Sequence, residues 1–313
     1  MSAAMVARRR VGERLGGAWR LLARKAWRDV WHLRGQMLAI ITVIALGVAT
    51  WVSLRGMVEY LTASQGGYYA SARFAHAFAR VTAAPLDVTE QVRRIPGVAA
   101  AEGRVVADVV ARVPGLTEPA TVRLVSIPGT GQPRLNALVL RAGRWPDPSQ
   151  RAEVLASEAF TLANGLRPGD AIEAVLNGRA ESLRIVGVAL SPEFIYEIPA
   201  TGAVLPDSRR FGVLWAPTDL LADAFDLRGS FNDLVVAYGP GADERAILPA
   251  IDRVLAPYGS LGAFGREEQI SHRFVSDEIE QNRKSALVVP VVFLGVAAYL
   301  LSLTLGRLVA LQR

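Results

Sequence analysis

The sequence between Ala286 and Leu305 reads ALVVPVVFLGVAAYLLSLTL and contains no charged residue. A helix of that length spans about 30 Å, which is the thickness of the hydrocarbon core of a bilayer. A buried core helix of a soluble protein is the alternative. Such a helix usually carries a polar stripe, and this segment has only Ser302 and Thr304 to form one. We therefore predict a transmembrane helix over residues 286–305.

A second uncharged segment of span length covers residues 36–54. Arg34 and Arg55 flank it, and long basic side chains can extend their charged ends to the membrane interface. We predict the first transmembrane helix here, which leaves residues 55–285 as one large domain between the spans.

Small residues recur at helical spacing within the second span. Small side chains let membrane helices approach closely, so we expect this face to pack against further helices, from another chain or a missing part of this one. Its candidate helix-packing residues are Gly295, Ala298 and Ser302.

Basic residues gather at the two ends of the chain. Residues 1–35 contain nine Lys and Arg against two Asp and Glu, whereas residues 55–285 contain 24 against 27. Cytoplasmic flanks of membrane helices carry an excess of positive charge. This distribution predicts both termini in the cytoplasm and the large domain outside it. A basic groove for nucleic acid is not indicated.

Residues 1–35 are expected to form a cytoplasmic, basic amphipathic helix. Apolar side chains recur at helical spacing over residues 18–34, and Arg20, Arg24 and Arg28 line another face. Three tryptophans beside arginines suit a helix in the lipid headgroup region. A basic flank without a defined helix is the alternative. A signal peptide is disfavoured because no small-residue cleavage site follows.

The large domain has an α+β pattern. Asn177-Gly178 is a strong hairpin turn, and Gly66-Gly67 is expected to end the first helix. We expect β-α-β units around an inserted β-rich portion over residues 114–191. Strands are predicted at 74–82, 121–128, 211–215 and 232–238, with two strands over 171–190 and either one long strand or a hairpin over 98–113. Helices are predicted at 86–95, 153–162, 218–225 and 242–255.

A charged helix is predicted over residues 267–285, directly before the second span. No glycine or proline interrupts it, and i,i+4 pairs such as Glu280 with Lys284 support it. We expect a near-continuous rod over residues 267–305, which could transmit a mechanical displacement across the membrane.

The residue content gives little support for catalysis. The chain has no cysteine, its three histidines match no metal-ligand spacing, and it lacks the phosphate-binding motif of ATPases. Ser271, His272 and Asp277 lie near one another in sequence, but on the predicted charged helix, where a solvated face is favoured over a triad. We expect no enzyme activity, cofactor or metal.

One long irregular loop, residues 192–211, is the candidate site for a substrate or partner. Such loops with aromatic side chains often bind something. Packing against its own domain is the alternative. Its candidate binding residues are Phe194, Tyr196, Arg209 and Arg210.

Several segments in order resemble the FtsX-like permeases of ABC transporters, the group that includes macrolide-efflux and lipoprotein-release systems. They include ARKAWRDVWHLRGQ (23–36), IPGVAAAEGRV (95–105), EVLASEAFTLANGLRPGD (153–170), LRIVGVALSPEFIYEI (183–198) and the second span running into GRLVALQR (306–313). The resemblance implies a MacB-like periplasmic core domain between the spans.

The resemblance also implies partners. A cytoplasmic ABC ATPase would drive the movement, and residues 306–313 would begin the segment that docks on it, with Arg307 and Arg313 as candidate contacts. Membrane lipids and further permease helices, or a second permease copy, would complete the assembly. Family permease domains have four spans and this sequence has two, so we expect a truncated product or the first part of a longer permease.

The sequence therefore predicts a bacterial inner-membrane, multi-pass protein, with two transmembrane helices flanking an α+β extracytoplasmic domain. The expected function is that of a permease subunit, its N-terminal part, which couples ATP hydrolysis by a partner to export or release of a lipophilic or peptide-like substrate. The alternative is a two-span receptor with a ligand-sensing ectodomain.

Overall fold

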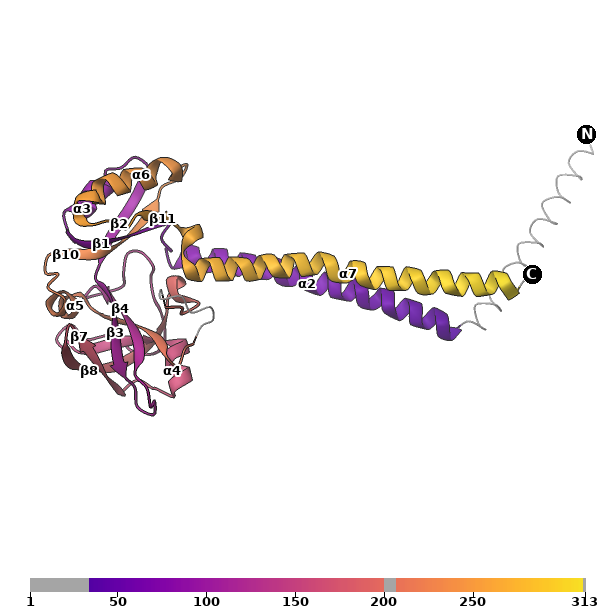
Figure 1. Cartoon of the computed structure of the whole chain (residues 1–313), viewed down its shortest axis with the longest axis horizontal. Helices are drawn as coiled ribbons and strands as arrows, with labels where there is room; N and C mark the ends of the chain where they lie inside the picture. The colour runs from indigo at the N-terminus through magenta and orange to yellow at the C-terminus, as the bar shows by residue number, and fades with distance from the viewer. Residues whose placement is uncertain (1–33, 200–206, 312–313) are drawn as a thin grey trace, which may run out of the picture. The chain divides into compact units, whose positions relative to one another are not determined.

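The computed structural model describes residues 34–199 and 207–311, so the expected N-terminal helix and Arg313 lie outside the described chain. The chain divides into two units. One holds the described residues up to Leu61 and from Ile279 onwards, and the other spans Thr62–Glu278 (Figure 1).

Two long apolar helices supply the first unit, α2 (Arg34–Ser71) and α7 (Ile270–Leu311). Both are long and apolar enough to cross a membrane, with candidate spans over Met37–Ser71 and Ile270–Thr304. Within this unit they approach closely at Gly47, where an added Cβ would lie 3.0 Å from Cβ of Phe293. The expectation of two span-forming helices around an α+β domain is confirmed.

The ends of both helices differ from the prediction. α2 continues through Gly66 and Gly67 to Ser71. Each glycine costs a helix about 1 kcal/mol relative to alanine, and packing of the following Tyr69 in a buried aromatic cluster offsets this cost. The second helix begins at Ile270, not at Glu267, because residues 266–268 form a separate 3-10 turn, η3 (Arg266–Glu268).

The second unit contains a four-stranded sheet in the order β11-β1-β10-β2, with antiparallel neighbours. Two β-α-β units interlock, since each pair of parallel strands encloses one strand of the other unit, as in ferredoxin-like domains. The predicted β-α-β pattern is thus observed. Its elements are β1 (Ala77–Pro85), α3 (Val88–Arg93), β2 (Val98–Arg104), β10 (Ser230–Tyr238), α6 (Glu244–Leu255) and β11 (Ala263–Gly265).

Both helices cover the same face of this sheet. Ala77, Ala79 and Val81 of β1 pack in one buried cluster with apolar residues of α3 and α6. Because side chains alternate along a strand, Phe78 and Arg80 point to the opposite face. That second face is not covered by α3 or α6; part of it packs against Tyr69 of α2, and part, as shown below, lines a cavity.

Between β2 and β10 the chain forms a second, seven-stranded sheet in the order β5-β8-β6-β9-β4-β3-β7. β7 also pairs with β8, so the strands from β8 round to β7 close into a barrel filled by apolar side chains. Its strands are β3 (Val106–Arg112), β4 (Ala120–Ile127), β5 (Val139–Gly143), β6 (Glu153–Ser157), β7 (Ala171–Leu176), β8 (Arg179–Leu190) and β9 (Phe211–Pro217).

The inserted β-rich portion was predicted, but it is longer than the predicted range of residues 114–191, since its strands run from Val106 to Pro217. The Asn177-Gly178 hairpin is confirmed, and both residues have the positive φ that its turn requires. Residues 98–113, predicted as one long strand or a hairpin, form two strands, which separate at Val105 into different sheets. Residues 153–157, predicted as helical, form strand β6, and helix α4 covers only Glu158–Asn164. A further short helix, α5 (Thr218–Ala224), packs against the barrel core.

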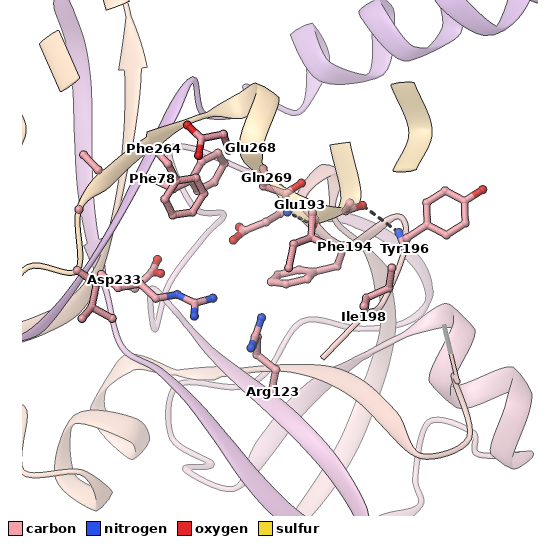
Figure 2. Close-up of a pocket in the computed structure, with 16 residues that line it drawn as sticks. Phe78, Arg123, Glu193, Phe194, Tyr196, Ile198, Asp233, Phe264, Glu268 and Gln269 are labelled. Atoms are coloured by element: carbon pink, nitrogen blue, oxygen red, sulfur yellow. Dashed lines mark hydrogen bonds between the residues drawn. The ribbon is translucent and has the colours of Figure 1, made fainter. Parts of the chain in front are cut away.

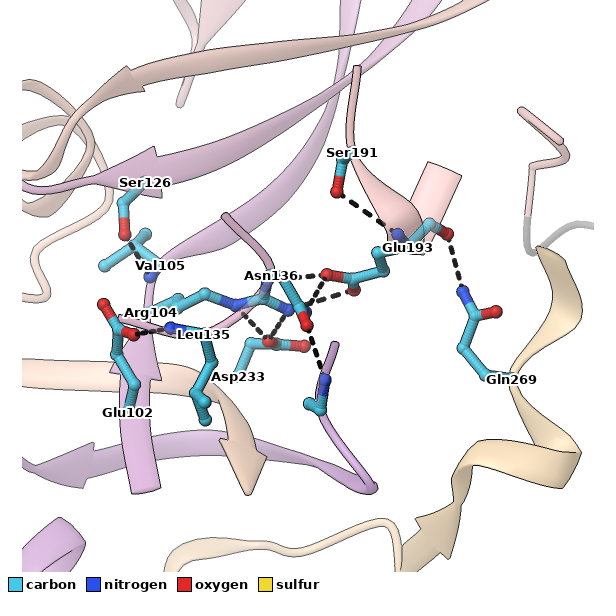
Figure 3. A network of polar contacts seen from close by, with 11 residues as sticks. Glu102, Arg104, Val105, Ser126, Leu135, Asn136, Ser191, Glu193, Asp233 and Gln269 are labelled. Carbon is cyan, nitrogen blue, oxygen red and sulfur yellow. Dashed lines mark hydrogen bonds and ion pairs between the residues drawn. The ribbon is translucent and has the colours of Figure 1, made fainter. Parts of the chain in front are cut away.

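A buried cluster of ions joins the four-stranded sheet to the barrel (Figure 3). Arg104, at the end of β2, donates from Nε to Asp233 of β10 at 2.9 Å. Its two other nitrogens donate to Glu193, which follows strand β8 of the barrel, at 2.7 and 3.0 Å. Asn136 adds a 2.7 Å bond to the same carboxylate. The three charged side chains are at most 10% exposed.

One cation thus bridges two carboxylates from different parts of the fold. Burial alone would raise the pKa of Glu193, but attraction to Arg104 and the bonds from Arg104 and Asn136 hold it below the usual value. The carboxylate therefore stays ionised, and its charge depends on a partner that lies in the other sheet.

We predict that Arg104→Met destabilises the protein by about 3–5 kcal/mol, because it leaves two buried carboxylates without a counter-ion. The measurement is equilibrium unfolding of the full chain in detergent, followed by tryptophan fluorescence. Adding Glu193→Gln and Asp233→Asn should recover part of the loss.

Arg141→Met is the matched control. Arg141 pairs with Glu158 at 3.1 Å on the surface, where a pair contributes up to about 1 kcal/mol. Equal stability of the Arg104→Met variant and this control would contradict a structural role for the buried cluster.

Candidate functional site: a cleft between the sheet and the barrel

A cavity of about 490 Å³ lies within the second unit, against the face of the four-stranded sheet that α3 and α6 do not cover (Figure 2). Three parts of the fold form its walls. Phe78 and Phe264 come from the sheet, Arg123 comes from barrel strand β4, and Ser271 comes from the first turn of α7. The segment after β8, which includes Glu193, forms the remaining wall of the cavity. We call this cavity the cleft.

Aromatic side chains give the cleft an apolar wall. Phe78 and Phe264 are register partners on β1 and β11, and their rings stack with centroids 5.6 Å apart. Phe194 lies across from them with its ring edge-on to Trp215, 6.3 Å away. Such a volume, lined by apolar groups with a few polar ones, is typical of small-molecule sites.

Most charged groups of the cleft are already paired. Glu193 and Asp233 bind Arg104, and Arg123 makes two bonds of 2.7 Å to Asp108. Burial alone would lower the pKa of Arg123, but its bond to Asp108 and the nearby carboxylates raise it. Two lining residues, Arg80 and Glu268, have side chains that take part in no ion pair or hydrogen bond of the described chain.

The segment Ser191–Ile198 links the cleft to α7. Gln269 Nε2 donates to the Glu193 carbonyl at 2.7 Å, and the Tyr196 amide donates to Ser271 Oγ at 2.9 Å. The Tyr196 hydroxyl donates to Glu278, and this bond, with partial burial, raises the pKa of the tyrosine. The first turns of α7 are therefore bonded to a wall of the cleft.

The C-terminal end of α2 and the N-terminal end of α7, which both lie in the second unit, are also joined to each other. The Tyr69 hydroxyl and His272 Nδ1 share a hydrogen bond of 3.1 Å, and Ser276 lies 3.2 Å from the other ring nitrogen. The guanidinium of Arg266 lies 4.8 Å from the centre of the Phe74 ring.

Ser271 Oγ accepts a bond from the Tyr196 amide and is not bonded to His272. Ser271, His272 and Asp277 therefore do not form a catalytic triad. Within residues 34–199 and 207–311, no group of three His, Asp or Glu could hold a metal ion.

The structure brings two of the four predicted loop residues into the cleft. Phe194 and Tyr196 line it, whereas Arg209 and Arg210 are not among its lining residues. Both arginines directly precede β9, and Arg210 pairs with Glu118 at 2.8 Å. The prediction grouped the four residues because they share one loop. Strand β9 begins directly after Arg210, so this end of the loop follows the strand and does not line the cleft.

Sequence reasoning missed the sheet side of the cleft. Phe78 and Arg80 alternate with Ala77, Ala79 and Val81, so period-2 alternation could have assigned them to a second face. Phe264 lies on a three-residue strand, for which the sequence carries no comparable signal.

The candidate contacts in the first unit remain predictions. Gly295, Ala298 and Ser302 lie on exposed faces of α7, while Phe293 and Ala297 are half-buried and buried. The small residues are therefore available to further helices. Arg307 lies in α7.

Glu197, next to the cleft wall, is a buried carboxyl group. It is 4% exposed, and its Oε2 has no hydrogen-bond partner in the described chain. Burial raises its pKa to about 7, against the opposing effect of a bond from Ser157. The group therefore changes charge near neutral pH.

We predict that Glu197→Gln stabilises the protein at pH 8 and changes little near pH 4.5. The folded pKa lies above the unfolded value of 4.5, so the parent loses stability as the pH rises from about 4.5 to about 7. The gain at pH 8 should be on the order of 1–3 kcal/mol. Thermal unfolding of parent and variant across this pH range measures it, and equal gains at both ends would contradict a buried neutral carboxyl.

No family model and no curated protein matches this chain. Among solved structures, the periplasmic region of MacB from Actinobacillus actinomycetemcomitans is 10% identical with a TM-score of 0.38, and the match covers 68% of this chain and 95% of that one. The extracellular domain of the ABC-type transporter YknZ from Gram-positive bacteria is 12% identical with a TM-score of 0.37, over 59% and 97%.

One neighbour is a periplasmic region and the other an extracellular domain of a transporter. The chain combines two apolar helices with an α+β domain that is similar to these two.

Proposed function

We propose that this chain is the N-terminal part of a permease subunit of an ABC transporter, located in the inner membrane of a bacterium. A separate cytoplasmic ATPase would supply the energy. The two helices would pass its movement to the extracytoplasmic domain, which would export or release a lipophilic or peptide-like substrate.

The continuity of α7 carries this proposal. One helix runs from Ile270 to Leu311 and includes both the apolar candidate span and the turn that lines the cleft. Ser271 in its first turn is bonded to Tyr196 on the cleft wall, and His272 is bonded to the end of α2. Gln269, directly before the helix, is bonded to Glu193. A displacement of α7 would therefore act directly on the cleft.

Charge supports the proposed topology. The basic excess of residues 1–35 favours a cytoplasmic N-terminus, and two spans then return the chain to the same side. A cytoplasmic C-terminal segment containing Arg307 and Arg313 would contact the ATPase. The resemblance of several segments, in order, to FtsX-like permeases is a separate line of support.

The direct test of the proposal is assembly with an ATPase. The chain, in its complete reading frame, would be co-expressed with ABC-type nucleotide-binding subunits from the same genome and purified through its own tag. We expect one of them to co-purify and to hydrolyse ATP faster in the complex. A chain that signals through another domain, and binds none of them, would instead support the two-span receptor.

We predict that Glu280→Pro abolishes ATP-driven transport, or reduces it at least about tenfold, while the protein still inserts in the membrane. Proline in a helix interior removes a backbone hydrogen bond and costs about 3 kcal/mol. Position 280 lies in α7, between the turn at the cleft and the uncharged stretch beginning at Ala286. Transport by the reconstituted complex measures the effect.

Glu280→Ala is the matched control, since it removes the same side chain and its pair with Arg283 without breaking the helix. It should transport within about twofold of the parent. Transport by the proline variant at the level of this control would exclude α7 as the transmitting element.

A further inference from the structure

We propose that the cleft binds an amphiphile with one anionic group. Its apolar part, which can contain an aromatic ring, packs against Phe78 and Phe264, and its anionic group is bound by Arg80. This names a site and a ligand class that the proposed transport function leaves open. The proposal rests on the geometry of the cleft, and equilibrium binding tests it without ATP or a partner subunit.

The apolar wall has room for a ring system. Phe264 is the partly exposed ring of the stacked pair, while Phe78 is 3% exposed and supports it, and Figure 2 shows both rings together on the sheet side of the cleft. Leu261 at the rim is 82% exposed, so an apolar side chain stands there unburied. A bound ring would remove these surfaces from water and gain from stacking.

Arg80 is the unpaired cation of the site among the described residues. It lies on β1 opposite Asp233 of β10, in direct register. The Asp233 carboxylate accepts two bonds from Arg104 instead. Arg123 is bound on two nitrogens by Asp108. An exposed guanidinium beside an apolar wall can therefore donate hydrogen bonds to a carboxylate, sulfonate or phosphate oxygen.

The place for the anionic group is where two cavities meet. A smaller cavity of about 180 Å³ shares Arg80, Arg123, Asp233 and Leu261 with the cleft. An anion bound by Arg80 at this junction would lie next to the apolar wall without entering it. The arrangement fits a molecule with a charged end and an apolar end.

The charges also limit the ligand to one negative group. The carboxylates of Asp108, Asp233 and Glu193 lie around the same cavities and would repel a polyanion. Glu268 lies at the other end, and Figure 2 shows it on the far side of the phenylalanine pair from Arg123. Its charge favours an orientation with the anionic group towards Arg80.

Two fluorescent probes with the same aromatic body test this inference. 1-Anilinonaphthalene-8-sulfonate carries a sulfonate, and N-phenyl-1-naphthylamine is the same framework without it. Each would be titrated into the full chain in phosphatidylcholine nanodiscs, with empty nanodiscs as background. We expect saturable binding of both, and tighter binding of the sulfonate.

Arg80→Gln should weaken sulfonate binding about three- to tenfold and leave the neutral probe within about twofold, as expected for one charge-assisted contact at a partly exposed site. Phe264→Leu should weaken both probes, because it removes the stacked wall. Glu268→Gln should strengthen the sulfonate slightly, about twofold, and leave the neutral probe unchanged.

Arg179→Gln is the matched control. Arg179 begins β8, is exposed, and does not line the cleft. It should bind both probes like the parent. The inference is overturned if Arg80→Gln affects both probes equally or neither, if Phe264→Leu changes neither, or if the chain binds no more probe than empty nanodiscs. These outcomes leave the association with an ATPase untouched, so failure of the ligand site and failure of the transporter assignment are distinguishable.

Discussion

Arg104 places a single positive charge between two carboxylates, and burial prevents water from replacing any of the three groups. Asp233 belongs to the four-stranded sheet, whereas Glu193 reaches the cluster from the barrel side. A buried cluster of this kind tolerates little displacement, because each lost bond leaves a charge without solvent or partner. The relation between the sheet and the barrel therefore depends in part on one guanidinium, together with the two bonds from Asn232 of β10 to the backbone of Val106 in β3. The cleft exists because these two parts are held at that spacing.

The same carboxylate connects the cluster to the helix. The side chain of Glu193 binds Arg104, its backbone carbonyl accepts from Gln269, and its neighbour Phe194 lines the cleft. A ligand in the cleft and a shift of α7 would thus act on the same few residues. Linkage then requires reciprocity: if a displacement of α7 changes ligand affinity, ligand binding must change the energy of that displacement by the same amount.

Those parts of the fold that depend on local pattern could be predicted from the sequence. The uncharged run ending at Leu305 specifies a helix by itself, and Asn177-Gly178 specifies its turn because few residues accept positive φ. Parts that depend on distant partners could not. Residues 153–157 have a helix-compatible composition but lie between two strands, β8 and β9, which fix them as β6. The cleft brings Arg123 of β4 together with Asp233 of β10, which lie far apart in the sequence, and only Phe194 and Tyr196 of its walls were predicted from the sequence as binding residues.

Closure of the barrel has a consequence for the behaviour of the chain at high concentration. Strand pairing runs from β8 round to β7 and back, which leaves β5 as the unclosed border of this sheet in the described chain. β5 is five residues long, and its pairing with β8 is irregular between Leu140 and Ala142. A short, bulged border is a poor template for strands of a neighbouring molecule. The barrel sheet is thereby protected from edge-to-edge pairing with neighbouring molecules.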